Sequence, residues 1–135
     1  MISKWLPFVL SIAIVLLVAT SVRAHHGTGL YYGASPVTLK GIVTEFAWEN
    51  PHVQIYFDVK DAKGNIVHWS CETLSPGKLT RSGWTRNSVK VGDSITITVS
   101  PAKTGAPVGS LKKLVLPDGT ALTALADDNY VAPKE

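Results

Sequence analysis

The sequence predicts a mainly β domain with one short helix, preceded by an apolar N-terminal segment. Three observations support this fold class. Apolar and polar residues alternate with a period of two in several segments after residue 37. Clusters of Gly, Pro, Asn and Asp separate these segments, as is typical of turns between strands. A single segment, residues 75–82, instead carries the residues that begin and end a helix.

The N-terminal segment has the features of a secretory signal. Lys4 is followed by an uncharged run from Trp5 to Val22. The segment then closes with Val22-Arg23-Ala24, a tripeptide typical of a cleavage site. We expect cleavage after Ala24, so that residues 1–24 are a signal peptide and the protein is periplasmic or secreted. The alternative is an uncleaved anchor, and the membrane would then be contacted only through this segment.

Length and charge describe one nearly neutral domain. Removing residues 1–24 leaves 111 of the 135 residues, enough for one modest core. The removed segment holds two basic residues and no acid, so the net charge of +3 falls to +1. A nearly neutral domain has little net attraction for phosphate backbones, and nucleic acid is not an expected partner. Cys71 is the only cysteine, so no internal disulfide can form.

Residues 25–36 are expected to form an extended lead-in, because glycines and a proline oppose a helix there. Residues 37–48 then form a long first strand. Its apolar phase runs through Val43 on one face and then moves to Phe46, which predicts a bulge or sharp bend. Gly41 would ease strong coiling at the same place.

Residues 52–60 and 66–73 are predicted to be the second and third strands, joined by a Gly-containing hairpin loop. Alternation places one set of side chains inward: Val53, Ile55, Phe57, Val59, Val67, Trp69, Cys71 and Thr73. The opposite set, which includes both histidines of these strands, faces outward.

The helix is expected over residues 75–82. Ser75 is a suitable N-cap residue. Gly83 can adopt the left-handed conformation that ends a helix, which would fold Trp84 back onto Leu79.

Residues 94–100 and 110–116 complete the predicted strands, followed by a short last strand around residues 121–124. Three strands, a helix and two strands are the order of a five-stranded Greek-key barrel of the OB-like (oligonucleotide/oligosaccharide-binding) type. A plain antiparallel sandwich is the main competitor, and it explains the single capped helix less well. We assign the barrel domain to residues 37–126 and a flexible tail to residues 127–135.

Three histidines form a candidate metal site. Cleavage after Ala24 would expose an α-amine and the imidazoles of His25 and His26, a nitrogen-rich set that favours Cu(II). His52, or alternatively His68, could add a third imidazole from an outward strand face. The alternative interpretation is that these are exposed histidines without a ligand.

Four further residues are candidates for a ligand or surface site: Asn50, Tyr56, Trp84 and Arg86. Asn50 belongs to the Asn-Pro-His turn, and Tyr56 is the one aromatic side chain that alternation clearly places outward. No catalytic constellation, phosphate-binding loop or zinc spacing is found, so we do not expect an enzyme.

Several motifs together support a family resemblance. These are His25-His26, residues 37–41, Trp48-Glu-Asn-Pro-His52 and Gly83-Trp-Thr-Arg86. The chain resembles a bacterial family of small exported proteins of unknown function. The resemblance implies a small β-barrel outside the cytoplasm and no established activity, with Cys71 and His68 outside its pattern.

We therefore expect an exported, non-enzymatic β-barrel that binds an unknown small ligand or an envelope protein. The alternative is a periplasmic copper-binding protein that uses His25, His26 and His52, with Cu(II) as its only cofactor. A third possibility is an envelope anchor or oligomer subunit.

Overall fold

The computed structural model describes residues 35–124. Their secondary structure follows the predicted order, with bounds that differ by at most two residues from those expected. The elements are β1 (Val37–Ala47), β2 (Gln54–Lys60), β3 (Ile66–Glu72), α2 (Pro76–Arg81), β4 (Ser94–Pro101), β5 (Val108–Val115) and β6 (Ala121–Thr123). Within these residues, no helix is long and apolar enough to cross a membrane.

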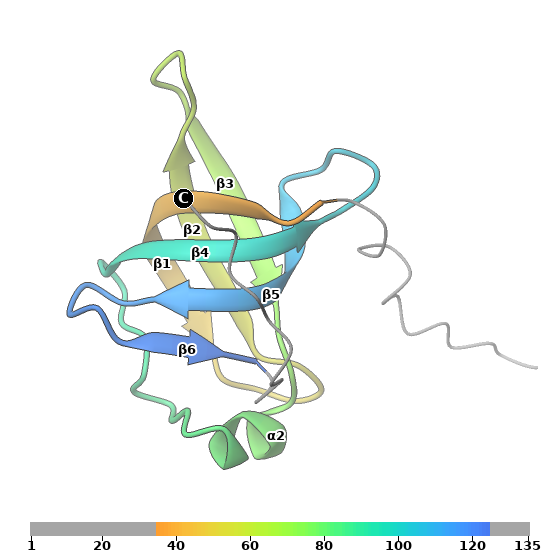
Figure 1. Ribbon diagram of the computed structural model, residues 1–135, viewed down its shortest axis with the longest axis vertical. Coiled ribbons are helices and arrows are strands. Elements are labelled where there is room, and N and C mark those ends of the chain that lie inside the picture. Colours follow the sequence, from red (N-terminus) through yellow and green to blue (C-terminus); the bar gives the residue numbers. More distant parts are fainter. Residues whose placement is uncertain (1–34, 125–135) are drawn as a thin grey trace, which may run out of the picture.

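The strands form one sheet in the order β3-β2-β1-β4-β5-β6 (Figure 1). Neighbours in this order are antiparallel, whereas β3 and β5 pair in parallel through residues 70–72 and 108–110. The parallel pairing closes β1 to β5 into a barrel, and β6 extends β5 as a hairpin. This closed five-stranded arrangement, with its helix between β3 and β4, confirms the predicted OB-like fold class.

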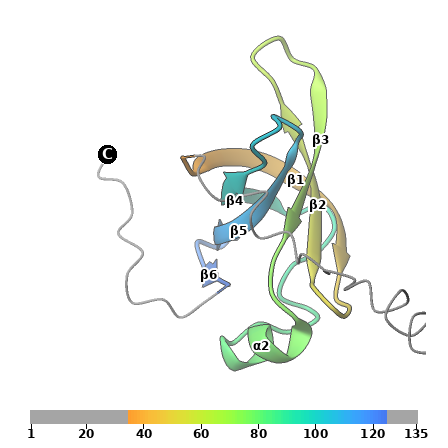
Figure 2. The same cartoon turned by 90° about the vertical axis from the view of Figure 1, so that its right-hand side faces the viewer.

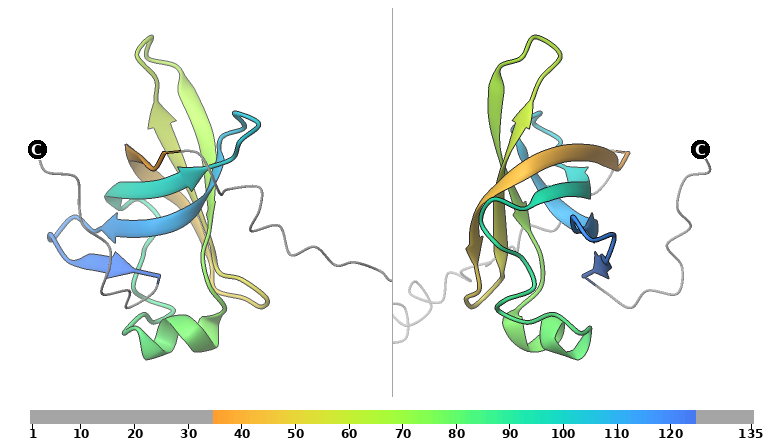
Figure 3. Two further views of the ribbon diagram at one scale, coloured as in Figure 1. Left: turned by 45° about the vertical axis from the view of Figure 1, so that its right-hand side comes forward. Right: turned by 90° about the vertical axis from the view of Figure 1, so that its left-hand side faces the viewer.

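The predicted irregularity in β1 is a β-bulge. Val43 pairs with Phe57 but the next pair is Glu45 with Tyr56, so Thr44 is the extra residue. The bulge lets both Val43 and Phe46 pack against the core although they are three positions apart, an odd spacing that would place them on opposite faces of a regular strand. β1 bends strongly at this side of the barrel and pairs with both β4 and β2 (Figure 3).

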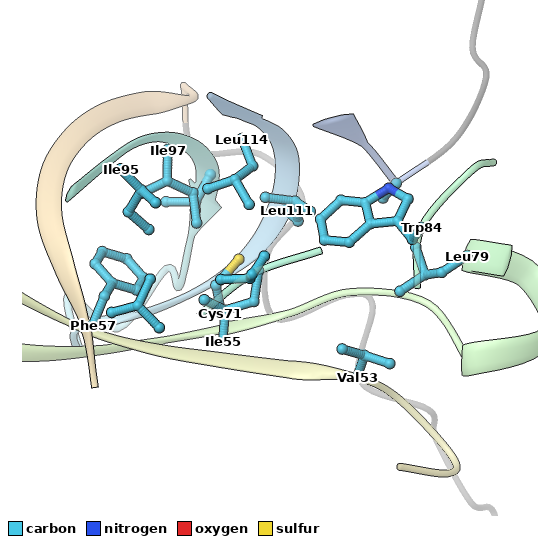
Figure 4. Close-up of a cluster of buried hydrophobic side chains, with 14 residues drawn as sticks. Val53, Ile55, Phe57, Cys71, Leu79, Trp84, Ile95, Ile97, Leu111 and Leu114 are labelled. Atoms are coloured by element: carbon cyan, nitrogen blue, oxygen red, sulfur yellow. The ribbon is translucent and has the colours of Figure 1, made fainter. Parts of the chain in front are cut away.

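The core lies inside the barrel and continues towards the helix (Figure 4). Its fully buried side chains include Val53, Ile55, Phe57, Cys71, Leu79, Trp84, Ile95, Ile97 and Leu114. Val59, Val67 and Trp69 were expected inward but are only partly buried. They lie in the outer half of the β2–β3 hairpin, which projects beyond the rest of the barrel (Figure 1).

The hairpin turn is held by Asp61. Its carboxylate accepts hydrogen bonds from the backbone N–H of Lys63 and Asn65, each 2.8 Å long, and from the Asn65 amide. These hydrogen bonds, above all the one from the Asn65 side chain, lower the pKa of Asp61 from its usual value. These hydrogen bonds of the Asp61 carboxylate, typical of an Asx turn, therefore fix the connection that sets the register of the two strands.

Helix α2 covers one end of the barrel (Figure 2). Ser75 occupies the N-cap position as predicted, but its side chain makes no capping hydrogen bond. Its backbone carbonyl accepts from Lys78 and Leu79 instead. Gly83 has a φ of 85°, and the Trp84 N–H donates to the Leu79 carbonyl at 3.1 Å, so the predicted fold-back is confirmed.

Gly41 lies where β1 crosses closely over β2. A Cβ at this position would lie 2.7 Å from the Asp58 carbonyl oxygen and 2.8 Å from the Phe57 ring. We expect Gly41→Ala to lower the free energy of unfolding by about 1–3 kcal/mol, as overpacking does. Equilibrium denaturation with urea measures this change.

Gly77→Ala is the matched control, because no atom lies within 4 Å of its added Cβ and the residue is helical. We expect this variant to be as stable as the wild type or slightly more stable. Equal stability of both variants and the wild type would contradict the role of Gly41.

Candidate functional site

The outer face of β2 and β3 carries a row of polar side chains, which we call the ligand face. Direct cross-strand neighbours are Gln54 with Glu72, Tyr56 with Ser70, and Asp58 with His68. His52 extends the row at one end and Glu45 of β1 lies opposite Tyr56. Strand alternation aims all of these side chains away from the buried set.

His52 and Glu72 form an ion pair at one end of the ligand face. The Nδ1 atom of His52 contacts Oε1 of Glu72, and both side chains are partly exposed. The position of His52 is fixed by the next residue, Val53, whose N–H donates to the Leu74 carbonyl and whose carbonyl accepts from the Thr73 N–H.

His68 and Asp58 form a second pair at the other end. Nδ1 of His68 lies 2.6 Å from Oδ1 of Asp58, and the His68 side chain is 82% exposed. The register of β2 and β3 places His68 directly opposite Asp58. An exposed pair of this kind contributes about 0–1 kcal/mol to stability. Its main effect is therefore to orient the imidazole of His68.

The two imidazoles cannot share one small ligand atom. His52 lies six positions before Asp58, the direct neighbour of His68, which corresponds to roughly 20 Å along an extended strand. Residues 35–124 contain no group of three or more His, Cys, Asp or Glu side chains suited to a metal ion. His25 and His26 lie outside the described residues, and their metal site stays a prediction.

The charge of the ligand face is negative. Glu45, Asp58 and Glu72 contribute carboxylates, whereas residues 52–59 and 66–73 contain no Lys or Arg. Lys60, at the hairpin end of β2, is the basic residue that shares this face. Tyr56 is the one aromatic side chain on this face that is exposed. The arrangement offers many hydrogen-bond acceptors around one stacking surface, and it repels phosphate groups.

Two of the other candidate residues are on the surface and one is not. Asn50 and Arg86 are exposed. Trp84 was predicted to be a ligand or surface residue, and this is wrong. Its side chain is fully buried, and its indole Nε1–H donates to the Thr123 carbonyl at 2.9 Å (Figure 4). The Gly83 turn that folds Trp84 back onto Leu79 is the physical reason.

Cys71 is also part of the core. Its side chain is buried beside β5, and burial raises the pKa of its thiol far above the usual value. A buried thiol with a raised pKa stays protonated and does not act as a nucleophile or metal ligand.

The sequence did not predict Asp58 and Glu72 as partners of the histidines. The available signal was the hairpin itself, since the loop of residues 61–65 sets which residues lie opposite each other. Counting outward from Lys60 and Ile66, on either side of this loop, places Asp58 beside His68.

Comparison with known families gives the identity of the chain. A model of a family of unknown function (DUF6152) matches residues 13–111, which is most of the chain. The protein belongs to this family. No curated protein sequence matches it.

One similar solved structure is the mitochondrial single-stranded DNA-binding protein Rim1 of S. cerevisiae. The TM-score is 0.48 at 13% sequence identity, over 63% of this chain and 95% of that chain.

Trp84 should matter for stability and not for the ligand face. Trp84→Phe removes the hydrogen bond to Thr123 and leaves space in the core. We expect a loss of about 1–3 kcal/mol in the free energy of unfolding, measured by urea denaturation. Arg86→Ala, two residues further along and exposed, is the control and should change stability by less than about 0.5 kcal/mol. Unaltered stability of Trp84→Phe would show that the indole is not needed to close the barrel.

Proposed function

We propose that this protein is a non-enzymatic binding module whose ligand lies on the β2–β3 ligand face. The observation that supports this most strongly is the continuous row of hydrogen-bonding side chains between the two His–carboxylate pairs. OB-like barrels use this face of strands 2 and 3 to hold their ligands.

The chemistry of the face favours a hydroxyl-rich, uncharged ligand, and we propose an oligosaccharide chain. Glu45, Glu72 and Gln54 offer acceptors for sugar hydroxyls, and Tyr56 offers a flat surface on which a sugar ring can stack. The carboxylates and the lack of Lys or Arg in these strand segments disfavour polyanions.

The surroundings of the Ser70 hydroxyl favour a binding role over catalysis. It lies between His68 and Glu72 on β3, but within the described residues no hydrogen bond joins its hydroxyl to an imidazole. Both Nδ1 atoms contact carboxylates instead. A nucleophile without an adjacent base has no activated form.

Tyr56→Ala tests the ligand face. A panel of immobilised oligosaccharides, probed with the labelled protein, should give binding that Tyr56→Ala weakens at least tenfold, because loss of a stacking surface costs about 1–3 kcal/mol. Thr96→Ala, on the outer side of β4, is the control and should bind like the wild type.

Three results would overturn the proposal. The first is no binding to any oligosaccharide, and the second is equal binding by the wild type and Tyr56→Ala. The third is turnover of a substrate that is lost on His52→Ala.

The His52–Glu72 pair supports a second candidate function, the binding of Cu(II). Its contact with Glu72 occupies Nδ1 of His52 and leaves Nε2 as the coordinating atom, which is the usual arrangement of metal-bound imidazoles. We propose that export and cleavage after Ala24 place the protein in the periplasm or outside the cell. His25 and His26 would then supply the other nitrogen ligands at the new N-terminus.

Native mass spectrometry of the mature protein tests the copper site, because the intact mass gives both the cleavage site and the copper stoichiometry. We expect one Cu(II) per chain and much weaker binding when one extra residue precedes His25, since the α-amine is displaced. His52→Ala should weaken binding further. Equal affinity with and without the extra residue would exclude the chelating N-terminus.

A further inference from the structure

A second part of the outer surface of the barrel carries three lysines. Its lysines are Lys40 of β1, and Lys112 and Lys113 of β5. Neither residues 37–43 of β1 nor any residue of β4, β5 and β6 is acidic. We call this surface the basic face.

The register makes the basic face continuous across three strands. Lys40 of β1 pairs with Thr96 of β4, and Thr98 of β4 pairs with Lys113 of β5. Thr98 itself is buried, and its hydroxyl is bonded to that of Thr38 of β1, with 3.0 Å between the two oxygens. Lys40 and Lys113 therefore lie on either side of β4, with Thr96 on the outer surface between them.

A second β-bulge raises the density of positive charge. Val99 pairs with Leu111 and Thr98 with Lys113, so Lys112 is the extra residue of β5. Leu111 and Leu114 are both buried. The two residues between them are consequently directed to the outer side together, which places two consecutive lysines on one face.

Exposed aliphatic side chains adjoin the lysines. Ile42 follows Lys40 on the same outer face and is 47% exposed. Val91 is 69% exposed, and the next residue, Gly92, donates a 2.8 Å hydrogen bond to the Val43 carbonyl. This hydrogen bond holds the loop that carries Val91 beside β1, so exposed apolar and basic groups lie together.

The basic face adjoins the ligand face at two seams. Ile42 pairs with Asp58 of the ligand face, and Ser110, two residues before Lys112, pairs with Glu72. Figure 2 shows β4, β5 and β6 on one side and β2 and β3 on the other, so the two faces turn apart away from these seams. A flat anionic surface is therefore attracted by the lysines and repelled by the carboxylates beyond the seams.

We propose that the basic face docks on the anionic phospholipid surface of a membrane. Each lysine near such a surface adds attraction, and adjoining aliphatic side chains enter the interfacial region. A nucleic acid would use the same lysines but gains nothing from Ile42 and Val91. Docking through these lysines brings Thr96 of β4, the direct neighbour of Lys40, closer to the lipid than Tyr56 of β2.

Vesicle binding by the full chain tests the proposal. The probes are vesicles of phosphatidylglycerol and of phosphatidylcholine, and the measured quantity is the ratio of the two partition coefficients. The triple variant Lys40→Gln, Lys112→Gln, Lys113→Gln should lower this ratio roughly 10- to 100-fold. The control Lys63→Gln, Lys78→Gln, Arg81→Gln has the same net charge as the triple variant and changes exposed residues away from the basic face, and should change the ratio less than about twofold. Any contribution from residues 5–22 is common to all variants.

A dye that reports a nonpolar environment shows which face touches the lipid. Because Cys71 is buried, Thr96→Cys and Tyr56→Cys each provide one accessible thiol. On phosphatidylglycerol vesicles we expect a blue shift at position 96 and none at position 56. Equal shifts, a shift only at position 56, or an unaltered ratio in the lysine variant would overturn the proposal. So would binding to a single-stranded oligonucleotide that depends on these lysines without a preference for anionic vesicles.

Discussion

The close approach of β1 to β2 at Gly41 is the contact on which the barrel depends. With no Cβ at this position, the Asp58 carbonyl and the Phe57 ring can lie directly against the β1 backbone. β1 can therefore coil from its pairing with β4 into its pairing with β2. Gly109 has a related role where the barrel closes, since a Cβ there would lie 3.0 Å from the Ser100 carbonyl oxygen. Both glycines mark sites where two backbones approach too closely for a side chain.

Closure has consequences for both outer faces. A closed barrel has one inner and one outer surface, and each strand alternates between them. The two bulges interrupt that alternation and add one outward residue each, Thr44 in β1 and Lys112 in β5. The first allows β1 to leave one side of the barrel and reach the other. The second places two consecutive lysines on the outer side of β5.

The barrel end is closed by long-range contacts of a single tryptophan. Trp84 packs with Leu79 of α2 and donates to the Thr123 carbonyl of β6, thirty-nine residues away in the sequence. The short last strand is consequently joined to the helix as well as to β5. Removing water from this end lets the apolar faces of β2 and β4 share one core with the helix.

The sequence by itself determined the elements and the face that each strand buries. Alternation identified the strands, the Val43–Phe46 phase shift identified the bulge in β1, and Gly83 identified the end of the helix. These are local properties, because the hydrophobic period of a strand or a helix depends on consecutive residues.

Only the tertiary structure decided which side chains meet. It paired His52 with Glu72 and His68 with Asp58, placed Trp84 in the core, and left Val67 and Trp69 partly exposed where the hairpin projects beyond the barrel. Such contacts depend on register and closure between distant strands, and a periodic pattern in one strand carries no information about the neighbour it will join.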